Sequence, residues 1–78
     1  MDGNMKGKII TDLALAAYLS TIGHQLSSIN PHGKKLEFCF LDSDKLEKDI
    51  LSFYNRQARV DPLAFAETFR NLKALTRV

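Results

Sequence analysis

The stretch that decides the fold is residues 26–41, which read LSSINPHGKKLEFCFL. Asn, Pro, His and Gly occupy positions 30–33, a combination that favours a type I turn followed by a left-handed glycine. This pattern predicts a β-hairpin whose three-residue loop, residues 31–33, is closed by a glycine bulge. With that loop length, Leu26 is expected to lie directly opposite Phe38 on the neighbouring strand.

Side chains of the second strand of this hairpin alternate between two faces. One face carries Leu36, Phe38 and Phe40, and the other carries Glu37, Cys39 and Leu41. A period of two with aromatic side chains on one face is typical of a half-buried strand. Because an isolated hairpin is marginally stable in water, the rest of the chain is expected to cover the phenylalanine face.

The residues before the hairpin predict a strand and a helix. The β-branched run at 8–10 predicts a short strand that joins the hairpin sheet. Thr11 or Asp12 can cap a helix expected over 12–22, and Gly23 supplies a left-handed stop. This helix is apolar on most of its sides, which predicts burial against the sheet.

The residues after the hairpin predict two further helices. The run 42–44 opens the first of them, where Asp44 and Glu47 resemble a capping box. Its expected apolar stripe is Leu46, Ile50, Phe53 and Tyr54. Asp61 as a cap and Pro62 at the first helical position predict the last helix, over 62–76. Its expected apolar stripe is Phe65, Phe69 and Leu72.

Together these elements predict an α+β fold in the order β-α-β-β-α-α. A small, mainly antiparallel sheet is expected to have the helices packed on one face. The length of 78 residues favours one domain, over 8–78. The polar, glycine-containing start of the chain predicts a flexible tail over residues 1–7.

Composition narrows the classes of function. The formal charge of +2 is too small to indicate a partner, although residues 50–78 hold five basic and two acidic side chains. The single cysteine excludes an internal disulfide, and no apolar run is long enough to cross a bilayer. We therefore expect a cytoplasmic protein without membrane contact. No pattern of metal ligands or catalytic residues stands out, so no metal, cofactor or catalytic residue is predicted.

Three motifs of this chain carry a family resemblance. They are Thr11-Asp12-Leu13-Ala14-Leu15-Ala16-Ala17-Tyr18-Leu19 with the Gly23 stop, Phe38-x-Phe40-x-Asp42-Ser43, and Val60-Asp61-Pro62. With them the chain resembles a group of short bacterial and phage-associated proteins catalogued only as a domain of unknown function, over roughly residues 8–76. The resemblance implies a small cytoplasmic α+β domain and transfers no catalytic residue.

The function favoured by the sequence is a non-catalytic protein-interaction or self-association module. If the phenylalanine face of the hairpin meets the helices, then Ile29, Cys39 and Leu41 point to the uncovered side among polar residues. An apolar patch with a polar rim is typical of an interaction surface. The short strand at 8–10 also leaves a sheet edge that a partner strand could extend. A homodimer or a protein partner is therefore expected.

The alternative is weak, sequence-nonspecific binding of nucleic acid. It depends on the basic C-terminal part, namely Arg56, Arg59, Arg70, Lys73 and Arg77. The spacing of the last two helices does not fit a helix-turn-helix, because the connection over 55–61 is longer than three to four residues. A solvated helix face also explains these charges. An enzymatic function is the third hypothesis, after protein interaction and nucleic-acid binding.

Overall fold

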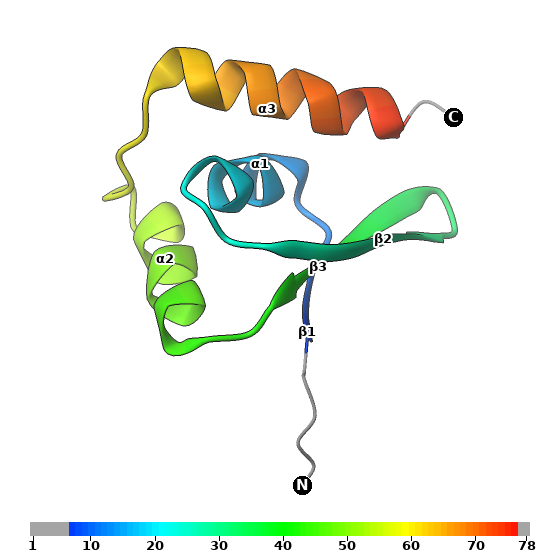
Figure 1. Cartoon of the computed structure of the whole chain (residues 1–78), viewed down its shortest axis with the longest axis horizontal. Coiled ribbons are helices and arrows are strands. Elements are labelled where there is room, and N and C mark those ends of the chain that lie inside the picture. Colours follow the sequence, from blue (N-terminus) through cyan, green and yellow to red (C-terminus); the bar gives the residue numbers. More distant parts are fainter. Residues whose placement is uncertain (1–6, 77–78) are drawn as a thin grey trace, which may run out of the picture.

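The computed structural model describes residues 7–76, which form three strands and three helices (Figure 1). The elements are β1 (Gly7–Ile10), α1 (Leu13–Thr21), β2 (Leu26–His32), β3 (Lys35–Leu41), α2 (Asp44–Tyr54) and α3 (Pro62–Leu75). The strands form one antiparallel sheet in the order β1-β3-β2. The predicted α+β class and element order are confirmed. Of the predicted tail over 1–7, only Gly7 lies within the described residues, and it begins β1.

The core lies between the sheet and the helices. Helix α1 lies between the sheet and α3, with α2 beside it (Figure 1). The largest fully buried side chains are Phe38 and Phe40 of β3, Leu19 of α1 and Leu46 of α2. The predicted phenylalanine face is therefore the core face of the sheet. No helix within residues 7–76 has the length and apolarity needed to span a membrane.

The predicted register of the hairpin is wrong. Ile29, not Leu26, lies opposite Phe38, and the turn is the two-residue loop 33–34 between paired His32 and Lys35. Gly33 has a φ of +66°, as a type II′ turn requires at its first central position. Pro31 is part of β2, where its missing N–H is tolerated because β2 is an edge strand.

A β-bulge in β2 explains why this register is favoured. Leu26 lies opposite Phe40 while Ser28 lies opposite Cys39, so β2 holds one extra residue at Ser27. Without the bulge, residues 26 and 29 would point to opposite faces, since side chains alternate along a strand. With it, Leu26 and Ile29 both pack against the core.

Helix α1 is buried on most sides because it contacts α2, α3 and the sheet. Five consecutive residues, 15–19, are buried. The Asp12 carboxylate accepts hydrogen bonds from the N–H groups of Ala14 and Leu15, so Asp12 is the cap. At the other end Gly23 has a φ of +104°, and the His24 N–H donates to the Leu19 carbonyl at 3.0 Å. This bond pattern is a Schellman motif, and the predicted helix stop is confirmed.

Helix α2 begins one residue earlier than the capping-box prediction implies. The Ser43 hydroxyl accepts from the Leu46 N–H at 3.0 Å, so Ser43 is the cap and Asp44 lies in the first turn. Leu46 is fully buried, while Tyr54 is 58% exposed and does not belong to the core stripe. The helix ends in a second Schellman motif, in which Arg56 takes the left-handed position with a φ of +61°.

Helix α3 begins as the sequence predicts. The Asp61 carboxylate accepts from the Ala64 N–H at 2.8 Å, and Pro62 is the first helical residue. Phe65 and Phe69 pack against the core with their rings stacked, and Leu72 is buried. The predicted stripe therefore faces α1.

Replacing Asp61 with alanine is expected to lower the free energy of unfolding by about 1 kcal/mol. The substitution removes the acceptor for an otherwise unpaired N–H at the start of α3. Urea unfolding followed by circular dichroism measures the loss. Asp61→Asn is the matched control, because asparagine caps equally well and should retain most of the stability. Equal losses in both variants would show that the cap has no such role.

Candidate functional site

The face of the sheet away from the helices carries a small apolar strip. Ile9 lies opposite Cys39, and Gly7 lies opposite Leu41. Since opposed residues share a face, Ile9, Cys39 and Leu41 form the outer strip, and Ile9 is 55% exposed. Towards the hairpin turn the same face becomes polar with Glu37 opposite Asn30.

The sequence-predicted surface of Ile29, Cys39 and Leu41 is only partly assembled. Cys39 and Leu41 lie on the outer face as expected, and both are half-buried. Ile29 lies opposite Phe38 and packs against the core, so its placement on the outer face is wrong. The two-residue turn is the physical cause, because it shifts the pairing of residues 28–32 by an odd number of positions from the predicted register and so exchanges the two faces. Ile9 completes the strip in its place.

Strand β1 is a free edge of the sheet. The Leu41 N–H donates to the Gln25 carbonyl at 3.2 Å, so the backbone of Leu41 is directed towards the β2 side of β3. Hydrogen-bonding direction alternates along a strand, so Phe40 and Phe38 bond Lys8 and Ile10 of β1. The N–H and C=O groups of Ile9 therefore point away from the sheet, and no other strand of residues 7–76 pairs with them.

The two edges of the sheet differ in how well they are protected against pairing with a strand of another chain. Strand β2 carries the bulge at Ser27 and a proline at position 31, two features that hinder pairing with another chain. Strand β1 has neither a proline nor a bulge, and it includes two isoleucines. Its only charged side chain, Lys8, pairs with Glu47 of α2 at 3.0 Å. The hydrogen bond to Glu47 raises the pKa of Lys8 above its ordinary value, and the Glu47 charge adds to this effect.

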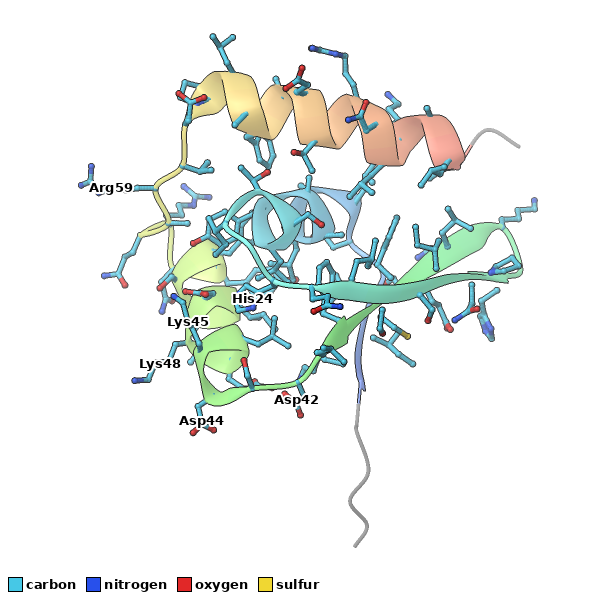
Figure 2. The ribbon with its side chains drawn as sticks, in the orientation of Figure 1. His24, Asp42, Asp44, Lys45, Lys48 and Arg59 are labelled. Carbon is cyan, nitrogen blue, oxygen red and sulfur yellow. The ribbon has the colours of Figure 1, made fainter. Side chains whose placement is uncertain are left out.

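The predicted nucleic-acid contacts are distributed over two places. Arg56 and Arg59 lie on the connection between α2 and α3, whereas Arg70 and Lys73 lie on α3, and all four are exposed. Arg77 lies outside the described residues. In Figure 2 Lys45 and Lys48 of α2 lie on the same side of the molecule as Arg59.

A partly buried polar cluster, absent from the sequence prediction, joins the end of α1 to α2. His24 Nε2 lies 2.6 Å from Asp49 Oδ2, and their side chains are 10% and 16% exposed. Lys45 Nζ lies 3.5 Å from the same oxygen. Burial by itself would raise the pKa of Asp49, but the hydrogen bond to His24 and the charge of Lys45 outweigh it and lower this pKa. His24 and Lys45 are labelled in Figure 2.

This cluster does not form a metal site with other side chains. Within residues 7–76 no group of three or more His, Cys, Asp or Glu side chains is placed to hold a metal ion. Cys39 is paired with Ile9 of β1 on one side and Ser28 of β2 on the other. Its thiol is free. The sequence signal for the His24–Asp49 pair is the position of Asp49, three residues after Leu46 and four before Phe53. This spacing places Asp49 on the apolar side of α2.

Comparison with family models gives a match over nearly the whole chain. The model of the family described as "Domain of unknown function (DUF5659)" matches residues 6–78. No curated protein and no solved structure matches the chain. The match confirms the resemblance to a domain of unknown function that the sequence motifs indicate.

Proposed function

The chain belongs to this family of unknown function, and we propose that it is a non-catalytic module that self-associates through strand β1. The observation that carries the proposal is the difference between the two sheet edges. Strand β2 has the bulge and the proline that hinder pairing, whereas β1 exposes the β-branched Ile9 and its outward-directed backbone groups. A bare edge of this kind can take a strand from a second copy.

The pairing register follows from charge and symmetry. Two β1 strands meeting antiparallel around a two-fold axis form an isologous contact, in which each residue meets the same surface of the other copy. A register centred on Lys8 would place two lysines directly opposite, which is destabilising. A register centred on Ile9 places Ile9 opposite Ile9 of the second copy, and their outward N–H and C=O groups can exchange two hydrogen bonds.

The outer strip supports the same arrangement. Pairing at β1 would extend two three-stranded sheets into one, with the strips of Ile9, Cys39 and Leu41 side by side on its outer face. Burying the exposed Ile9 side chains against each other adds an apolar contribution to the hydrogen bonds.

We also propose a cytoplasmic location and a bacterial or phage source, which rest on composition and on the motif resemblance.

Ile9→Pro is expected to weaken dimerisation by about 5- to 150-fold. The substitution removes the outward N–H of Ile9, and two lost hydrogen bonds of about 0.5–1.5 kcal/mol each correspond to that factor. The N–H does not bond β3, so the monomer should keep its fold. Sedimentation velocity over a concentration series measures the association.

Ile9→Val is the matched control, because valine keeps both the N–H and the β-branched shape. Leu41→Glu tests the outer strip independently and should also favour the monomer. A wild-type protein that stays monomeric at all accessible concentrations would contradict the proposal. Dimers that persist unchanged in Ile9→Pro would place the contact elsewhere on the surface.

A further inference from the structure

An apolar pocket lies where the three helices meet, on the side of the molecule away from β1. Its volume is about 250 Å³. The pocket is lined by Tyr18, Phe53, Arg56, Ala58, Val60 and Phe65. Two of these lining rings, those of Tyr18 and Phe53, lie 5.6 Å apart between α1 and α2. This volume is below the range of drug-sized ligand sites, about 300–1,000 Å³, and suits one ring or one large apolar side chain.

Arg56 is the only permanently charged residue of this lining, and its backbone is strained. It has a φ of +61°, the only positive φ of a non-glycine residue within 7–76. In the equivalent position of the motif that ends α1, the chain has Gly23. An arginine in the left-handed position loses stability relative to glycine, so a side-chain role offers a reason for its presence.

The charges around the pocket favour an anion at Arg56. Among residues 7–76 no ion pair involves the Arg56 guanidinium. Asp49, the acidic group whose charge acts on Tyr18, is already paired with His24 and Lys45. Burial, and then the Asp49 charge, raise the pKa of the Tyr18 hydroxyl, which therefore stays neutral at physiological pH. The lining thus combines aromatic walls with one available cation.

We propose that this pocket binds an apolar, preferably aromatic, group that bears a carboxylate. The ring enters between Tyr18, Phe53 and Phe65, and the Arg56 guanidinium pairs with the carboxylate in the planar geometry that suits these two groups. Such a group can be a free aromatic acid or the C-terminal residue of a peptide. The site is separate from β1, so it does not depend on self-association.

The test uses 3-phenylpropionate and its uncharged amide as probes of the wild-type protein. Amide chemical shifts of Ala58 and Val60 in NMR titrations report occupancy. The acid is expected to bind at least about tenfold more tightly than the amide, since a charge-assisted pair is lost in the amide. Equal affinities for the two probes, or no binding of either at millimolar concentration, would overturn the proposal.

Arg56→Gly separates a binding role from a structural one. Glycine suits the left-handed position, so this variant is expected to be at least as heat-stable as the wild type and to bind the acid at least about tenfold more weakly. Arg59→Gly is the matched control, because it removes the same charge from the same connection but lies outside the lining, and it should bind normally. An Arg56→Gly variant that binds as well as the wild type would overturn the role of Arg56.

Two short peptides ending in phenylalanine, one with a free carboxylate and one amidated, distinguish the sources of the ligand. Binding of the free peptide at the affinity of 3-phenylpropionate or above supports recognition of a protein C-terminus. Binding of the acid alone supports a free aromatic acid. Loss of all binding in Ile9→Pro, with the monomer folded, would contradict the separation of this site from the β1 edge.

Discussion

Phe40→Ala is expected to lower the free energy of unfolding by about 3–5 kcal/mol. Phe40 is fully buried in the central strand β3, with neighbours on both flanking strands, Lys8 and Leu26. Truncation removes a whole aromatic ring and leaves a cavity that the surrounding sheet and helices cannot fully close. Small domains have about 0.05–0.15 kcal/mol of stability per residue, so this loss is a large part of the total.

Leu41→Ala is the control for this prediction, because it shortens the adjacent residue of the same strand on the outer face. Leu41 is half-buried, so its truncation should lower stability by much less than that of Phe40. Urea unfolding of both variants at one pH gives the comparison. Losses of similar size would show that the two faces of β3 are equally packed, which would contradict the assignment of the core.

The core face of β3 and the starts of α1 and α3 could be predicted from local sequence because local chemistry determines them. Alternation in β3 identifies Phe38 and Phe40, and the Asp12 and Asp61 caps need only the N–H groups of the following turn. The hairpin register is different. A type I turn at Asn30 and a type II′ turn at Gly33 are both compatible with local preference, and the choice between them depends on burial.

That burial is non-local. The observed register, together with the bulge at Ser27, brings Leu26 and Ile29 to the core face, whereas the predicted register would place Ser28 there. Ile29 is partly buried, so it gains a part of the roughly 1.5–3 kcal/mol that complete burial of an isoleucine contributes, and this gain favours the observed turn over the predicted one. The wrong register also made the predicted interaction surface partly wrong, since it placed Ile29 on the outer face of the sheet.

The remaining parts of the surface and cluster depend on contacts between distant segments. Ile9 belongs to the outer strip because β1 pairs with Cys39, and no local pattern fixes that pairing. His24 and Asp49 are 25 residues apart. The sequence places Asp49 on the apolar side of α2, where a carboxylate needs a polar partner. It does not show that this partner is His24, because only the folded chain brings the two residues together.

Asp49→Ala is expected to lower the free energy of unfolding by about 1.5–3 kcal/mol at pH 7, the range for a hydrogen bond to a charged group. With the Asp49 carboxylate ionised, His24 Nε2 is the donor of the 2.6 Å bond. Removal of the acceptor leaves that N–H mostly buried without its partner, at the junction where β2 leaves α1 and meets α2. Thermal or urea unfolding at pH 7 measures the loss.

The same pair predicts the direction of the pH dependence. The pKa of Asp49 is lower in the folded state than its ordinary value of 3.8, so the unfolded state takes up the proton first as the pH falls. The stabilisation is therefore complete above about pH 5 and is lost as the pH falls below about 4, towards the folded-state pKa. The difference in stability between the wild type and Asp49→Asn should shrink over this window, because asparagine keeps an acceptor but does not titrate. The other carboxyl groups are common to both proteins and cancel in the comparison. A difference that stays constant from pH 7 to pH 3 would show that the Asp49 charge makes no contribution to folding.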